Sequence, residues 1–146
     1  NDATFELTGV QLEVGDIATD FEHRSYGDEL ARCQRYYENV KGASYQSGNE
    51  VLVANGFNYE TNRVLGNFQF KVEKRAMPSV STDDASEVEL LKTGSSWNAS
   101  GGFGGNANIY STRLDCTSIV GSPMNAGQAC EIRLVSDGII HFNAEL

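Results

Sequence analysis

Apolar and polar residues alternate in short runs along this chain, and a period of two predicts β-strands with one buried face. The clearest run is Val64 to Val72, which places Phe68, Phe70 and Val72 on one face. An earlier run, Val10 to Val14, alternates in the same way and predicts a strand close to the start of the chain. These runs predict a protein built mainly from short strands.

Turn-forming residues separate the other expected strands. Asn55-Gly56 predicts a hairpin-type turn that ends one strand, and Asp137-Gly138 predicts a hairpin between the last two. Asp28 to Arg32 has the only helix-forming composition and predicts one short helical turn. Eight to ten strands without a long helix predict an all-β fold, an antiparallel β-sandwich of jelly-roll-like topology. The remaining strands are expected at 34–40, 50–54, 88–91, 108–114, 117–120, 128–135 and 138–146.

Two stretches carry too little apolar character for a buried strand. Thr82 to Ser86 predicts a solvated loop that contains the acid pair Asp83-Asp84. Thr93 to Asn108 is rich in glycine, serine and asparagine, so it is expected to form either a long loop or a pair of edge strands.

Composition limits the size and the partners of the domain. The chain has 146 residues, 40% hydrophobic and 21% charged, which suits one sandwich domain and not two full cores. Its formal net charge of −9 argues against nucleic acid or an anionic membrane as a partner, because both require a basic face. No apolar run reaches the roughly 20 residues of a membrane helix, so no membrane insertion is expected. The start at Asn1 suggests a boundary within a longer polypeptide.

Three cysteines leave two interpretations open. Cys116 and Cys130 flank a glycine-containing loop and could face each other across a hairpin. The favoured interpretation is that both, with Cys33, are small apolar residues in a protein made in a reducing cytoplasm. None has the spacing of a zinc site, and no metal or cofactor is predicted.

No motif in the sequence predicts catalysis. A glycosidase needs two carboxyl groups about 5–10 Å apart across a sugar, whereas adjacent acids such as Asp83-Asp84 are usually just solvated. The sequence contains no nucleophile elbow, HExxH motif or phosphate-binding loop. The protein is therefore expected not to be an enzyme.

Aromatic residues among small polar ones indicate a possible carbohydrate site, because a sugar ring packs on an aromatic face while polar groups bind its hydroxyls. Trp97 could instead fill the end of the sandwich core. Phe103, between glycines, is typical of an apolar ring at a loop tip. The candidate ligand-binding residues are Trp97, Phe103, Tyr110, Tyr45 and Tyr59.

The run VQLEVGDIATDFEHRSYGDELARCQRYY, from Val10 to Tyr37, resembles a junction in the C-terminal module of tailed-bacteriophage tail fibre and tailspike proteins. Segments 68–80 and 139–146 are also similar to that module. The resemblance implies a homotrimeric virion part at the fibre tip, made in the host bacterial cytoplasm, that recognises a bacterial surface glycan or another host receptor. A trimerisation cap without a ligand and, third, a carbohydrate-active enzyme domain are the alternatives.

The resemblance also divides the chain into a terminal strand and linker arm at 1–26, continuing from a preceding domain, and a β-sandwich at 27–146. Large apolar residues of the arm lack strand alternation, so they pack either on a sister subunit or on their own domain. Ile140 and Phe142, on the closing strand, could belong to the interface or to the core. The candidate trimer-interface residues are Ile17, Phe21, Tyr26, Ile140 and Phe142.

Overall fold

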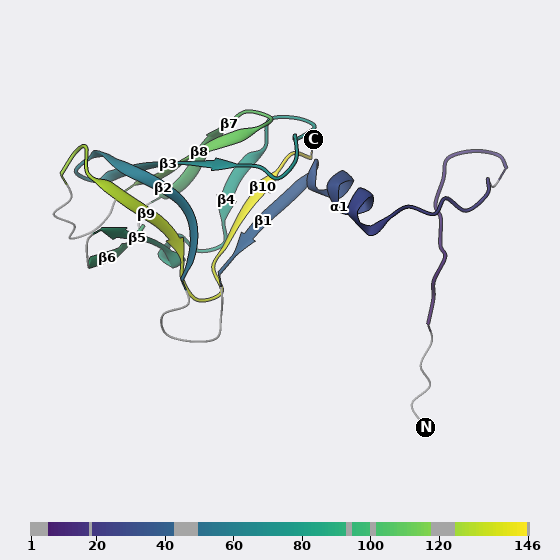
Figure 1. Ribbon diagram of the computed structural model, residues 1–146, viewed down its shortest axis with the longest axis horizontal. Coiled ribbons are helices and arrows are strands. Elements are labelled where there is room, and N and C mark those ends of the chain that lie inside the picture. The colour runs from purple at the N-terminus through teal and green to yellow at the C-terminus, as the bar shows by residue number, and fades with distance from the viewer. Residues whose placement is uncertain are drawn as a thin grey trace, which may run out of the picture.

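The chain folds into a β-sandwich from which a helix and an extended arm project (Figure 1). The computed structural model describes residues 6–17, 19–42, 50–92, 95–99, 102–117 and 125–145. We refer to residues 6–17 and 19–25 as the arm. Helix α1 (Tyr26–Gln34) follows the arm and leads directly into the first strand.

Ten strands in the described residues form two antiparallel sheets. The small sheet has the order β1-β10-β4, and the large, curled sheet has the order β6-β5-β9-β2-β3-β8-β7. This architecture confirms the predicted antiparallel β-sandwich. The strands are β1 (Tyr37–Lys41), β2 (Val51–Glu60), β3 (Arg63–Gln69), β4 (Ser79–Thr82), β5 (Val88–Lys92), β6 (Ser95–Asn98), β7 (Gly102–Ala107), β8 (Ser111–Thr117), β9 (Ala129–Leu134) and β10 (Ile139–Asn143).

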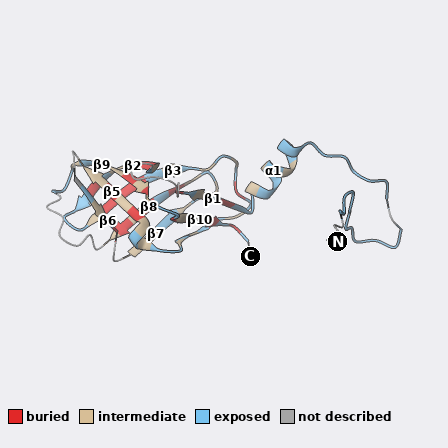
Figure 2. Cartoon of the chain, turned by 90° about the horizontal axis from the view of Figure 1, so that it is seen from below, coloured by how far each residue is buried: buried red, intermediate tan, exposed pale blue. Residues whose placement is uncertain are grey.

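The core lies between the sheets and is built from alternate residues of the strands (Figure 2). In β9 every second residue is buried, including Ile132 and Leu134, and the intervening residues are partly exposed. Phe142 of β10 stacks on Phe68 with ring centroids 4.7 Å apart, and Phe70 meets it edge-on at 5.3 Å. The predicted apolar face of 64–72 is thus confirmed for its two phenylalanines, although β3 ends before Phe70 and Val72.

The predicted strand at Val10–Val14 is wrong for this chain, because the described part of the arm contains no strand. A strand requires a neighbour that accepts its backbone hydrogen bonds, and no strand of the sandwich runs beside the arm (Figure 1). The predicted helical turn at Asp28–Arg32 is confirmed and extends to the nine residues of α1.

Two turn predictions are corrected. Asn55-Gly56 lies inside β2, which continues to Glu60, and the chain turns at Thr61-Asn62. Asp137-Gly138 does lie in a tight turn, but β9 and β10 belong to different sheets and form no hairpin. Each error arose because a local turn signal does not reveal which strands pair.

The glycine-rich region at 93–108 forms two strands, β6 and β7, which are the opposite edges of the large sheet. Of the two predicted alternatives for this region, the pair of edge strands is therefore confirmed and the long loop is not. Within the predicted loop at 82–86 a short 3₁₀ helix, η1 (Ala85–Glu87), begins, and Asp84 caps it by accepting a hydrogen bond from the Ser86 N–H. Most of the expected strand at 117–120 lies outside the described residues.

Candidate functional site: the arm, helix α1 and the cavity between them

The arm and α1 expose more large apolar side chains than any other part of the described structure. Leu12 is 99% exposed, Ile17 82% and Tyr26 81%, and Val10 and Val14 are also exposed. Figure 2 shows this region almost entirely in the colour of exposed residues, whereas buried residues gather between the sheets. Large exposed apolar side chains are typical of interaction surfaces, so this region is the candidate functional site.

Helix α1 forms because its sequence satisfies both helix ends. Ser25 caps the N-terminus by accepting a hydrogen bond from the Asp28 N–H, and the acidic Asp28 and Glu29 lie in the first turn. Tyr26, Leu30 and Cys33 recur at intervals of four and three residues, so they lie on one face, and all three are exposed. We call these three residues the α1 stripe.

A buried ion pair attaches α1 to the sandwich. The Lys74 ammonium donates to the Gln34 carbonyl oxygen at 2.6 Å and to Glu38 Oε2 at 2.7 Å, and both charged side chains are almost fully buried. Lys74 thereby satisfies a free carbonyl in the last turn of the helix, where a cation also interacts favourably with the helix dipole. The Arg75 N–H donates to the Arg35 carbonyl and extends the attachment by one residue.

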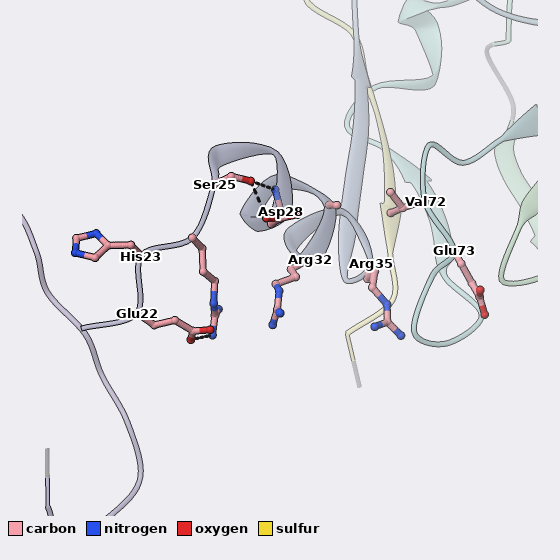
Figure 3. A pocket seen from close by; sticks show the side chains of 10 residues that line it. Glu22, His23, Ser25, Asp28, Arg32, Arg35, Val72 and Glu73 are labelled. Carbon is pink, nitrogen blue, oxygen red and sulfur yellow. Dashed lines mark hydrogen bonds and ion pairs between the residues drawn. The ribbon is translucent and has the colours of Figure 1, made fainter. Parts of the chain in front are cut away.

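An open cavity of about 730 Å³ lies between the arm, α1 and residues 72–73. Arg24, Arg32 and Arg35 line it, and Figure 3 shows Arg32 and Arg35 projecting from the same side of the chain, with Glu22 and Glu73 at the two ends. Three guanidinium groups and three carboxyl groups, those of Glu22, Asp28 and Glu73, therefore line one cavity of mixed charge.

The three arginines differ in whether they are already paired. Arg24 pairs with Glu22 and, at 2.9 Å, with Glu29. The hydrogen bond to Arg24 lowers the pKa of Glu22, and the two carboxylates together raise the pKa of Arg24. Arg32 and Arg35 form no ion pair with any described residue. These two groups are available to bind carboxylates from another chain or ligand.

The structure does not bring the predicted ligand-binding residues together. Trp97 of β6 and Phe103 of β7 lie on opposite edges of the large sheet, and both are partly buried against the core. Tyr110 and Tyr59 are 60% and 52% exposed, and Arg63 lies 5.5 Å from the Tyr59 ring centroid. Tyr45 lies outside the described residues.

The candidate interface residues separate into two groups. Ile17, Phe21 and Tyr26 are exposed, Phe21 least at 44%, so they do not pack into their own domain. Ile140 and Phe142 are fully buried in the core and have no surface to offer, so their assignment to an interface is corrected to the core alternative. Their strand, β10, lies between β1 and β4 in the small sheet, and its inward positions face the large sheet.

Sequence reasoning missed a chain of side chains on the outer face of the small sheet. Tyr37 and His141 are joined by a 2.6 Å hydrogen bond, and His141 is joined to Asp83 at 3.0 Å. The three residues are far apart in the sequence, and only the register of β1, β10 and β4 brings them together. The sequence carries no clear signal for this chain of side chains, because nothing in Tyr37-Glu38-Asn39 indicates that Glu38 is the buried position.

The described residues contain no group of three His, Cys, Asp or Glu side chains that could hold a metal ion. In the same residues, no helix has the length and apolar character needed to cross a membrane. Cys116 and Cys130 are free, buried thiols on β8 and β9, two strands that do not pair. A scan against protein-family models and searches of curated proteins and of solved structures found no match to this chain.

Proposed function

We propose that this chain is the C-terminal module of a phage tail fibre or tailspike, located at the tip of the virion appendage. In this proposal three copies assemble through the arm and α1, and the sandwich recognises a glycan on the host cell surface. The resemblance of residues 10–37 to that family supplies the trimer and the virion location.

The observation that carries the proposal is the exposed apolar surface of the arm. Leu12, Ile17 and the α1 stripe are exposed to water in a single copy, and burying them gives about 25 cal/mol for each Å² of apolar surface. A sister copy is the simplest partner, because symmetric association buries the same residues on every chain at once.

Charge supports the same assembly. The arm carries the acidic residues Glu6, Glu13, Asp16, Asp20 and Glu22 and one basic residue, Arg24. Arg32 and Arg35 at the other side of the cavity lack a partner in their own chain's described residues. The acidic arm of one copy and the guanidinium groups of Arg32 and Arg35 in the next carry opposite charges, which favours one arrangement of the chains.

The alternative of a structural trimerisation cap has one observation in its favour. Trp97 and Phe103, the aromatic residues expected to contact a ligand, pack against the core and so serve the fold. Variants of these two residues would therefore lose folding as well as binding, so a loss of binding in them would not identify a ligand site.

Light scattering and glycan-array binding on the same purified sample test the proposal. We expect a mass of three chains and binding to at least one bacterial surface glycan or to host cells. A monomer at micromolar concentration would contradict the assembly. A stable trimer that binds neither glycans nor host cells would contradict recognition and leave the cap.

A further inference from the structure

The outer face of the small sheet carries two aligned rows of polar residues and one tyrosine. Asn39, His141 and Ser81 occupy one row across β1, β10 and β4, and Tyr37 and Asn143 occupy the next, with Ser79. The intervening residues of these strands, such as Ile140 and Phe142, point into the core. Solvent-facing positions of an antiparallel sheet are usually polar, so polarity alone identifies no site.

Four side chains on and beside this face are linked to one another by hydrogen bonds, which an ordinary solvent-facing sheet surface does not require. Asn39 Nδ2 donates to Tyr37 Oη at 3.3 Å, Tyr37 Oη lies 2.6 Å from His141 Nδ1, and His141 Nε2 lies 3.0 Å from Asp83 Oδ1. Since a carboxylate only accepts, Nε2 donates to Asp83, and when Nδ1 carries no proton it accepts from the Tyr37 hydroxyl. All four side chains are thus ordered in one direction, from the amide to the carboxylate.

This order holds polar groups in place at a surface where they would otherwise move freely. Fixing these four side chains costs conformational entropy, and a ligand that binds them afterwards does not incur that cost again. Tyr37 remains 39% exposed, and its ring lies 5.9 Å from the His141 ring, tilted by 37°. The face therefore combines an accessible aromatic ring with oriented polar groups.

We propose that this face, with Tyr37, Asn39, His141 and Asp83 at its centre, binds a neutral pyranose unit of a host glycan. This inference rests on the proposed function and gives its recognition site. The sugar ring packs on Tyr37, and its hydroxyls donate to the second oxygen of Asp83 and to the amide oxygen of Asn39. Acidic sugars are disfavoured because Asp83 and the net charge of −9 repel them.

The order of acid, imidazole and hydroxyl is that of a nucleophile triad, but the position favours binding. The side chain of Asp83 is 65% exposed, so water reaches the group that would orient the base. Nucleophilic catalysis of acyl or glycosyl transfer gains from excluding water, and an open sheet face does not do so.

The test compares variants of this face with matched tyrosine controls against the neutral glycan that the intact protein binds best on the array. We expect Asp83→Asn and Tyr37→Ala each to weaken binding by at least about tenfold, the effect of losing one charge-assisted hydrogen bond or the ring contact. Tyr59→Ala and Tyr110→Ala, exposed tyrosines on other surfaces, should stay within about twofold. Thermal unfolding checks that each variant is folded. The Asp83 side chain is 65% exposed, so Asp83→Asn should fold and can test the site alone if Tyr37→Ala does not fold.

The outcomes separate this inference from the proposed function. If both face variants still bind glycan but a control tyrosine variant does not, the proposed site is wrong. The proposed function of host recognition then still stands. A preference for acidic glycans over neutral ones overturns the ligand class. An intact trimer that binds no glycan overturns both.

Discussion

At the scale of single residues, burial decides how much an ion pair contributes to the stability of the fold. Lys74 and Glu38 are almost fully buried, and Glu38 Oε1 has no hydrogen-bond partner among the described residues. Lys71 also approaches Glu38, at 3.8 Å, but its side chain is 64% exposed. The two lysines therefore provide a matched comparison of a buried and a surface ion pair.

We expect Lys74→Met to lower the free energy of unfolding by about 3–5 kcal/mol, because it leaves the Glu38 carboxylate buried without a counter-charge. Lys71→Met should change it by less than about 1 kcal/mol. The double variant Glu38→Gln/Lys74→Met should recover most of the loss. Urea unfolding at one fixed chain concentration measures all three, and equal effects of the two single variants would contradict the role of burial.

The buried thiols give a pH-dependent prediction. Burial raises the pKa of Cys116 to about 12 and that of Cys130 to about 11, since the folded interior disfavours the thiolate. A raised pKa means that the folded state holds its proton longer than the unfolded state. This contribution to stability is complete below the ordinary thiol pKa of 9.0 and is lost as pH rises towards 12.

We expect the free energy of unfolding to fall more steeply above pH 9 in the intact protein than in a Cys116→Ala/Cys130→Ala variant. In a Cys33→Ser background, a thiol reagent at pH 8 should label neither remaining cysteine until the protein is unfolded. Rapid labelling of the folded protein would show that these thiols are accessible.

At the scale of elements, close packing of strands explains why Gly56, which resembles part of a turn signal in the sequence, lies within a strand. Gly56 lies opposite Gly66 in the β2–β3 pair. A Cβ at Gly56 would lie 2.6 Å from the Leu65 carbonyl oxygen, and one at Gly66 would lie 2.5 Å from Ile132 Cδ1. The glycine serves close contact within the sheet, and no turn is present there.

We expect Gly56→Ala to lower the free energy of unfolding by about 1–3 kcal/mol, because backbone atoms must move to admit the methyl group. Gly104→Ala, in β7 of the same sheet, is the control, because a Cβ there would meet nothing within 4 Å. The control should be neutral or slightly stabilising. Thermal unfolding of both variants distinguishes a steric effect from a general intolerance of alanine in this sheet.

At the scale of the whole molecule, the single chain leaves part of its apolar surface exposed to water. Its sandwich has a closed core, while the arm and the α1 stripe project with their apolar side chains exposed (Figure 1). Lys74 attaches the end of α1 to the sandwich, and in the proposed trimer the α1 stripe would face sister copies.

We expect Leu30→Asp, and separately Ile17→Asp, to reduce the mass measured by light scattering from three chains towards one, because a charge would be buried at the interface. Leu52→Asp is the control: Leu52 is 51% exposed, against 41% for Leu30, but lies on the sandwich. Assembly should also protect Cys33, so its thiol should react faster in the Leu30→Asp variant. An unchanged mass in both arm variants would contradict assembly through this surface.

The sequence by itself determined the fold class, the helix and most strand positions. Period-two patterns such as that around Phe68 and Phe70 depend only on neighbouring residues and on the need of a strand to bury one face. The capped helix at Ser25 is similarly local. The missing alternation in the arm left open whether Ile17 and Phe21 pack on their own domain or on a sister subunit, and the structure shows both exposed.

Only the tertiary structure decided which strands pair, and therefore which distant side chains meet. Asp137-Gly138 joins two different sheets, and Gly56 lies within a strand. Val10–Val14 has no strand beside it. None of this is visible locally, because strand pairing depends on contacts across the whole chain. The same dependence placed Trp97 and Phe103 on opposite edges and joined Tyr37, His141 and Asp83 on one face. Local patterns set which way a side chain points within its strand, and strand register sets its neighbours.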